Sequence, residues 1–454
     1  MRKFLTAKAV MIKKYMDDWD NPKKESVIFA IIMISSLLLR FFYICYTSVY
    51  DMQHDVGTPH EMDGHLGYIA YLMSAHHLPD FDVREAFQFW HPPVHHAVSA
   101  LFLSMVWKLI PARQGNYEAL QLLPLVYVTI CIWLVWKLLK LWDYNGKSAI
   151  FPFFLIAFNP TFIIMSGSVN NDPLCFMFMF LAMYFAVLWY RMPSYHLIMA
   201  CALSIGFGMS TKGTAAIIAF PVGALFLLKW IKEKKKVFWQ LALFAVLVFP
   251  LGFWWYIRNY LLYGVPVNYI YYTGADTIGY LGYMPAWKRA LDFDIHHFTF
   301  ENIYLQFEGR YTDTNPIIGL LKTTVFGQWR YNYNLYIKAL AYVLFFIWVA
   351  LVVVSLCAVW SFVKKRKEYL AESISIVILF AVQFASYYHF CITYPFVWTM
   401  DIRYAVPILL CQCLFAAEYI REKKRFKYGT ICLCSLFAII AVMCFVLLSF
   451  TRFA

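Results

Sequence analysis

Residues 51–96 read DMQHDVGTPHEMDGHLGYIAYLMSAHHLPDFDVREAFQFWHPPVHH, and this stretch decides how the rest of the chain is interpreted. It holds seven acidic residues and eight histidines, and it lies between long apolar runs. Binding and catalytic residues concentrate in loops that a rigid scaffold positions. We therefore expect the chemistry of this protein to take place in this one polar segment, beside a bundle of apolar helices.

The composition indicates an all-α polytopic membrane protein. Of the 454 residues, 62% are hydrophobic and only 14% are charged, which exceeds what a soluble domain needs for its core. The net charge of +13 could indicate a nucleic-acid-binding protein. The basic residues instead cluster in short runs between apolar segments, which is the positive-inside pattern of membrane proteins. We expect a lipid bilayer as partner, and no nucleic acid.

About eleven apolar runs are predicted to cross the membrane, although several are shorter than the roughly 20 residues that a bilayer requires. Residues 1–25 are basic and are expected in the cytoplasm, and residues 26–454 are expected to form a single transmembrane domain. The runs cover about 26–46, 120–142, 148–165, 173–190, 196–210, 214–231, 237–257, 336–360, 372–390, 405–420 and 430–450. The basic junctions expected in the cytoplasm lie at 137–147, 232–236, 364–367 and 421–427.

A further apolar run at 94–110 is predicted to lie in the outer membrane interface. If it crossed the bilayer, every later basic junction would fall on the outer side, against the positive-inside rule. We therefore predict an amphipathic interfacial helix that carries His95, His96 and Lys108 on its polar positions. The non-spanning segments 47–119 and 258–335 then face outward, together with the turns near 166–172 and 211–212 and the loop 388–404.

Three carboxylates of the first outer segment are candidate general bases. Asp55, Glu61 and Asp63 follow the first apolar run directly, among several histidines. Low-dielectric surroundings can tune a carboxylate for proton transfer. The alternative is a solvated loop with ordinary acids. His91 precedes Pro92-Pro93, which suits a helix start, and it would lie at a helix N-terminus that favours anions.

Other polar residues are expected to converge on the same outer face. Asp172 lies in the turn Ser166–Pro173, either as an ordinary turn residue or as part of the site, holding a hydroxyl substrate or a divalent ion. No cofactor is required by the sequence, and a divalent metal is an open alternative. Isolated cations either reach toward water or bind a lipid phosphate. These are Lys212, Arg258, Arg330 and Arg403.

The order and sidedness of these motifs resemble the GT-C superfamily of integral membrane glycosyltransferases. The likeness is to the protein O-mannosyltransferases and the lipid A aminoarabinose transferases, and it covers most of the chain. The motifs that carry it are Asp63-Gly64-His65-Leu66-Gly67, His91-Pro92-Pro93-Val94, Asn171-Asp172-Pro173, Thr211-Lys212-Gly213, Arg258-Asn259-Tyr260, Tyr263-Gly264-Val265-Pro266 and Asp401-Ile402-Arg403-Tyr404. Met62 interrupts the family's acidic pair, so its catalytic aspartate corresponds either to Asp63 or to Asp55.

The resemblance implies a GT-C fold with interfacial helices in the first outer loop, and a polyprenyl-phosphate sugar as donor. The catalytic aspartate would accept a proton from an acceptor hydroxyl, whose oxygen attacks the anomeric carbon with inversion. Lys212, Arg258 or Arg403 would stabilise the departing polyprenyl phosphate. The other substrate-binding candidates are Glu61, His65, His91 and Arg330.

The sequence leaves the acceptor open between a lipid, a wall polymer and a protein. It contains no nucleotide-binding fingerprint, in agreement with a lipid-linked donor. The alternative functions are a polyprenyl-linked lipid transporter or flippase and a non-catalytic protein of cell envelope assembly. The composition suits a multi-pass protein of a bacterial plasma membrane with an extracytoplasmic active site, and the endoplasmic reticulum is the alternative location.

Overall fold

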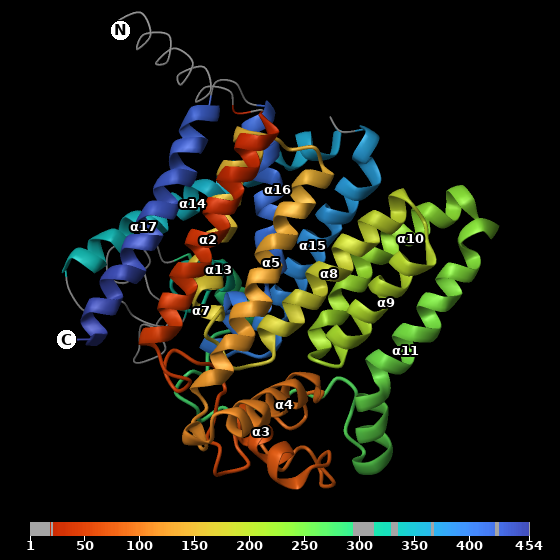
Figure 1. The fold of residues 1–454 in the computed structure, drawn as a ribbon, viewed down its shortest axis with the longest axis vertical. Coiled ribbons are helices and arrows are strands. Elements are labelled where there is room, and N and C mark those ends of the chain that lie inside the picture. Colours follow the sequence, from red (N-terminus) through yellow and green to blue (C-terminus); the bar gives the residue numbers. More distant parts are fainter. Residues whose placement is uncertain are drawn as a thin grey trace, which may run out of the picture.

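The structure, a computed structural model, describes residue 19 and residues 21–293, 313–327, 335–364, 367–422 and 426–453. Within these residues the chain is helical, and its β pairing consists of two isolated bridges, Thr58 with Asp63 and Tyr280 with Phe396. Long helices run side by side as a bundle, and a smaller group of loops and short helices covers one end (Figure 1). The predicted all-α class is confirmed.

Eight helices in the described part of the chain are long and apolar enough to cross a bilayer. Helices suit this task because they satisfy every backbone hydrogen bond internally. The chain is therefore a multi-pass membrane protein. The eight, some with an adjoining 3-10 turn, are α2 (Pro22–Tyr46), α5 (Leu122–Leu141), α8 (Asp172–Arg191), α10 (Ala219–Glu233), α11 (Lys235–Tyr263), α14 (Leu335–Lys364), α15 (Leu370–Thr393) and α17 (Lys427–Phe453).

Shorter helices occupy the three remaining runs of the predicted eleven. The run at 148–165 is divided into α6 (Lys147–Ala157) and α7 (Pro160–Met165). Pro160 cannot donate a backbone hydrogen bond, and the side chain of Asn159 caps the new helix by accepting from Thr161 N at 2.9 Å. α9 (Tyr195–Met209) packs against α8 and α11, and α16 (Pro407–Glu422) packs against α14 and α6. The count of eleven spans stays a prediction.

The basic junctions meet at the end of the bundle where α2 begins (Figure 1). Side-chain contacts join helix ends that are far apart in the sequence. They are Lys140–Glu25 at 2.7 Å, Arg191–Glu372 at 3.1 Å, Lys232–Tyr190 at 3.1 Å, and Lys147 above the ring of Tyr428. The segment after α2 lies at the opposite end, so the geometry has the two-sided arrangement that the positive-inside argument requires.

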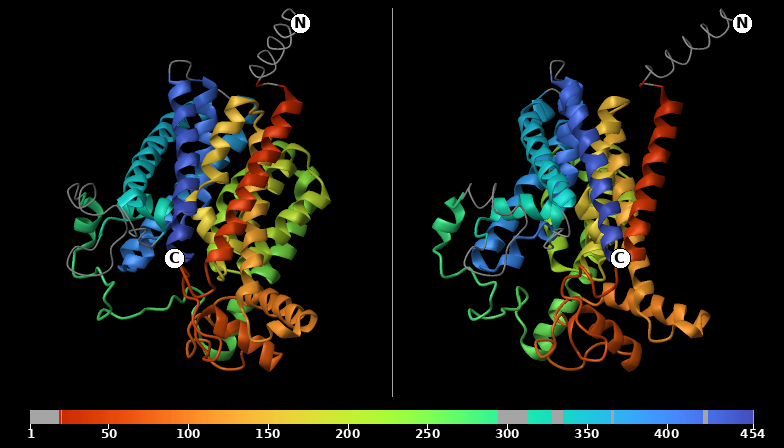
Figure 2. Two further views of the ribbon diagram at one scale, coloured as in Figure 1. Left: turned by 60° about the vertical axis from the view of Figure 1, so that its left-hand side comes forward. Right: turned by 90° about the vertical axis from the view of Figure 1, so that its left-hand side faces the viewer.

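Helix α4 (Val94–Leu109) lies across that opposite end, as Figures 1 and 2 both show. It is packed against α3 (Gly64–Ala75). This placement agrees with the prediction of a helix that does not cross. The predicted orientation of the helix is wrong, however, because His95 and His96 are only 1% and 0% exposed. α3 covers their face, and an apolar stripe is exposed instead, formed by Val98, Leu101, Met105 and Leu109.

The predicted loop 258–335 is partly helical. α11 continues to Tyr263, and the segment contains α12 (Ala286–Leu291) and α13 (Pro316–Phe326). α13 is bonded to α7, because Thr161 Oγ1 donates to Thr324 O at 2.7 Å. Thr323 Oγ1 accepts from Ile402 N at 2.9 Å, so α13 also supports the segment that carries Arg403. Arg330 lies outside the described residues.

Candidate active site

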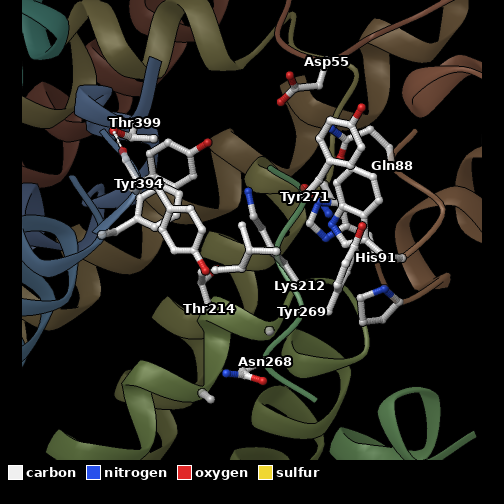
Figure 3. A pocket seen from close by; sticks show the side chains of 18 of the residues that line it. Asp55, Gln88, His91, Lys212, Thr214, Asn268, Tyr269, Tyr271, Tyr394 and Thr399 are labelled. Atoms are coloured by element: carbon white, nitrogen blue, oxygen red, sulfur yellow. Dashed lines mark hydrogen bonds between the residues drawn. The ribbon is translucent and has the colours of Figure 1, made fainter. Parts of the chain in front are cut away.

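A cavity of about 930 Å³ opens at the end of the bundle that α3 and α4 cover (Figure 3). Its walls come from the first loop, the turn after α9, the segment after α11 and the segment between α15 and α16. Five residues singled out in the sequence line it: Asp55, His65, His91, Lys212 and Arg403. The fold therefore brings together side chains that are up to 348 positions apart.

Asp55 is held in an unusual backbone conformation. Its φ is +56°, a region that residues with a side chain rarely adopt. The loop around it is closed by two glycines, and a Cβ on Gly57 would lie 2.0 Å from Asp63 O. The backbone then binds the start of α3, since His65 N donates to Asp55 O at 3.0 Å. Only glycine permits this approach, and the result fixes Asp55 at the cavity wall.

Arg403 forms an ion pair with Asp55 in the wall of the cavity. The guanidinium Nη1 lies 2.7 Å from Asp55 Oδ2. Burial raises the pKa of Asp55, but the charge of Arg403 and its hydrogen bond outweigh this, and the pKa lies below its ordinary value. The carboxylate is therefore ionised at neutral pH. The buried Nε of Arg403 has no hydrogen-bond partner, which leaves a donor for a bound anion.

Asp401 supports this pair from behind. Its side chain accepts from Arg403 N at 2.8 Å, and its other oxygen lies 3.4 Å from His54 Nε2. His54 and Asp55 are adjacent in the first loop. They contact Asp401 and Arg403, respectively, in the segment between α15 and α16. Burial raises the pKa of Asp401 to about 6, against the lowering effect of Arg403.

Lys212 and Asp172 form a second buried pair. Lys212 Nζ lies 2.6 Å from Asp172 Oδ1, and Lys212 faces the cavity while Asp172 lies behind it. The other carboxylate oxygen of Asp172 is buried without a hydrogen-bond partner. Lys212 and Arg403 both lie over the ring of Tyr404, at 5.4 and 4.8 Å from its centroid. One aromatic ring therefore interacts with both cations.

A cluster of histidines forms the wall next to α4. His65 Nδ1 and His96 Nε2 are 2.9 Å apart, and the ring of His91 lies parallel to that of His65 at 6.1 Å. Burial, together with the charge of Lys212, lowers the pKa of His91 to about 3. Burial likewise lowers the pKa of His95 to about 3. These rings are neutral at pH 7 and can exchange hydrogen bonds with hydroxyl groups.

Other candidates lie away from the cavity lining. Glu61 is exposed, and Asp63 precedes α3 in a bridge with Thr58. Arg258 donates to Pro79 O and lies over the ring of Trp255, where it joins α11 to the first loop. Of the two aspartates between which the sequence left the choice of base open, Asp55 lines the cavity and Asp63 does not.

The sequence did not single out several lining residues. Gln88, Tyr269 and Tyr271 all line the cavity. The two tyrosines belong to the predicted outer segment 258–335, and Gln88 belongs to none of the motifs found in the sequence. Among the described residues, no group of three or more His, Cys, Asp or Glu side chains is arranged to hold a metal ion.

Comparisons with known proteins bear on the fold and the family. Residues 90–255 match the family model described as dolichyl-phosphate-mannose-protein mannosyltransferase. The crystal structure of ArnT from Cupriavidus metallidurans in the apo state superimposes with a TM-score of 0.53 at 12% sequence identity, over 93% of this chain and 77% of that one. Fold and family model together support a GT-C glycosyltransferase. Among curated protein sequences, none matches significantly.

The GT-C resemblance and fold class expected from the sequence are thereby confirmed. The matched region begins at Trp90, just before the His91-Pro92-Pro93 helix start, and ends in α11. It includes Asp172 and Lys212 but not Asp55 or Arg403. The roles proposed for the individual residues therefore rest on the geometry of the cavity.

Proposed function

We propose that this protein transfers a sugar from a polyprenyl-phosphate donor to an acceptor hydroxyl, with inversion, on the outer face of the membrane. The observation that carries the proposal is that one cavity is lined by an ionised carboxylate, Asp55, by its ion-pair partner Arg403, and by a second cation, Lys212, which pairs with Asp172. Glycosyl transfer from a phosphate needs a base for the acceptor and positive charge for the leaving group.

The reaction follows from these positions. Asp55 accepts the proton of the acceptor hydroxyl while that oxygen forms a bond to the anomeric carbon. The bond between the anomeric carbon and the phosphate oxygen breaks on the opposite face of the sugar, and its electron pair stays with the polyprenyl phosphate. Lys212 Nζ and the unpartnered Nε of Arg403 supply hydrogen bonds to that phosphate.

The walls of the cavity suit a ligand with an apolar tail. Ile217 and Phe253 line one side and Phe390 lines another, beside the polar centre. A lipid-linked donor has this division, with a charged head and a hydrocarbon chain. The cavity also lies at the end of the bundle opposite the basic junctions, which supports an extracytoplasmic reaction.

The test is a transfer assay with purified protein in lipid nanodiscs and a panel of polyprenyl-phosphate sugars. Asp55→Asn should lower the rate of transfer by about a hundredfold or more, because a positioned base contributes that much. Asp63→Asn is the matched control and should retain transfer close to that of the unchanged protein. If no donor in the panel is consumed, or if Asp55→Asn retains full activity, the proposal is wrong.

A further inference from the structure

Gln88 is an unexplained polar residue of the cavity wall. Its side chain lines the cavity, the residue is only 4% exposed, and its amide oxygen is buried without a hydrogen-bond partner. Buried polar atoms in folded proteins are nearly always paired, so an orphan atom in a side chain that lines a cavity indicates a partner supplied by a ligand. The missing partner is a donor, such as a hydroxyl group.

The backbone holds Gln88 in place at a cost. Its φ is +71°, and such strain persists only where the surrounding structure enforces it. The neighbouring residues provide that support. Ala86 and Phe89 are buried, and the ring of Phe89 stacks on Tyr68 of α3 at 4.3 Å between centroids. The turn is thus held by packing on both sides of Gln88, and the side chain is kept in the cavity wall.

Aromatic rings stand next to this amide. Trp90 and Tyr271 stack with their centroids 5.3 Å apart and their planes 6° from parallel. Tyr269 meets Trp90 edge-on at 6.1 Å. All three line the cavity, and Figure 3 shows Gln88, Tyr269 and Tyr271 grouped with His91 on the side where Asp55 lies, across from Tyr394 and Thr399.

Such a wall has the chemistry that a sugar ring requires. The C–H bonds of a pyranose form apolar faces that pack on aromatic rings, and its hydroxyls need hydrogen-bond partners at the edge. We propose that Gln88, Trp90 and Tyr271 form a pyranose-binding subsite, in which a sugar hydroxyl donates to the Gln88 amide oxygen. This inference rests on the proposed function. The pyranose is either the transferred sugar of the donor or a sugar of the acceptor.

Binding and kinetics of Gln88→Met separate these two sources, because methionine keeps the length of the side chain and removes the amide. The probes are polyprenyl-phosphate mannose and sugar-free polyprenyl phosphate, bound to protein in nanodiscs. If the donor sugar occupies the subsite, Gln88→Met weakens binding of the first by about tenfold and leaves the second unchanged. If an acceptor sugar occupies it, donor binding is unchanged and the KM for a saccharide acceptor rises by about tenfold.

Tyr271→Ala is the second variant, since Tyr271 is exposed and its loss does not disturb a core. It should show the same pattern as Gln88→Met. The matched controls are Gln114→Met and Tyr283→Ala, both at exposed positions that do not line the cavity, and neither should change binding or KM. If neither sugar-dependent quantity moves, or if both lipids lose affinity equally, the subsite is refuted.

A separate experiment tests the subsite in the case that the proposed function is wrong. If the protein binds no polyprenyl phosphate at all, methyl α-mannopyranoside, methyl α-glucopyranoside and methyl α-galactopyranoside are titrated while tryptophan fluorescence is recorded. A change in fluorescence that Trp90→Phe abolishes supports the subsite independently of lipid-linked chemistry. No change with any of the three overturns it.

Discussion

At the scale of single residues, His95 of α4 is one group that makes the stability of the protein depend on pH. His95 is buried, and neither of its ring nitrogens has a hydrogen-bond partner. Its pKa falls from an ordinary value near 6.5 to about 3. Between these two pH values the unfolded chain binds a proton at this position that the folded chain does not. The free energy of unfolding therefore decreases as pH falls through this window.

We predict that His95→Leu makes the protein less sensitive to acid. One titrating group with this shift changes the free energy of unfolding by about 1.4 kcal/mol per pH unit, and leucine removes that contribution. The measurement is the thermal unfolding temperature in detergent at pH 7.5 and pH 5.0, for both proteins. The variant should lose less stability over this interval. Equal losses would show that His95 does not titrate in this way.

At the scale of one element, the turn before α3 depends on the absence of a side chain. Gly64 has φ +67°, and a Cβ there would lie 2.4 Å from Gly57 N. We predict that Gly64→Ala displaces the loop that holds Asp55, because a backbone atom cannot move aside as a flexible side chain does. Transfer activity should fall by about tenfold or more, as expected when a catalytic group is misplaced by an ångström.

Gly115→Ala is the matched control for this prediction. Gly115 has φ +82°, but a Cβ there would meet nothing within 4 Å. It therefore carries a similar backbone strain, about 1 kcal/mol, without the clash. Activity should survive in this variant, with a small decrease in unfolding temperature. Equal effects of the two substitutions on activity would contradict the argument from close approach.

Helix α4 also shows where sequence reasoning reached its limit. Its existence and the Pro92-Pro93 start follow from local chemistry, and parity of the basic junctions indicated that it does not cross. Its orientation depended on what α3 would cover, which no local pattern of 94–110 contains. A helix with histidines at two adjacent positions can point them to water or to a protein partner. Packing of α3 settles this in favour of the protein.

At the scale of the whole molecule, the fold class could be predicted from the amino-acid composition, but the full set of residues that line the cavity could not. Lys212 and Arg403 stood out as isolated charges in an apolar chain, and Asp55 as one of several acids in the polar segment 51–96. The distinction between Asp55 and Asp63 could not be drawn, because it depends on a turn between two glycines and on a partner from the far end of the chain. Gln88 could not be identified from the sequence, because what distinguishes it is conformational: a positive φ and an amide oxygen without a hydrogen-bond partner.

Sidedness is tested on the whole chain. A reporter fused after residue 115 should read as extracytoplasmic, since that residue follows α4 at the cavity end of the bundle. A second fusion after residue 234, in the basic junction between α10 and α11, should read as cytoplasmic. The pair of fusions serves as its own control. If both reporters are found on the same side of the membrane, the placement of α4 is contradicted, and so is the proposed reaction on the outer face.

The ion pair between Asp55 and Arg403 can form only late in the synthesis of the chain. A chain inserted from its N-terminus exposes Asp55 early, but Arg403 is synthesised 348 residues later. The ion pair cannot form until Arg403 has been synthesised. Closing a loop of this length then also has an entropic cost. In the proposed mechanism, sugar transfer therefore requires that the chain be synthesised beyond residue 403. A chain truncated before residue 401 would still contain most of the helices but would lack Arg403, the ion-pair partner of Asp55.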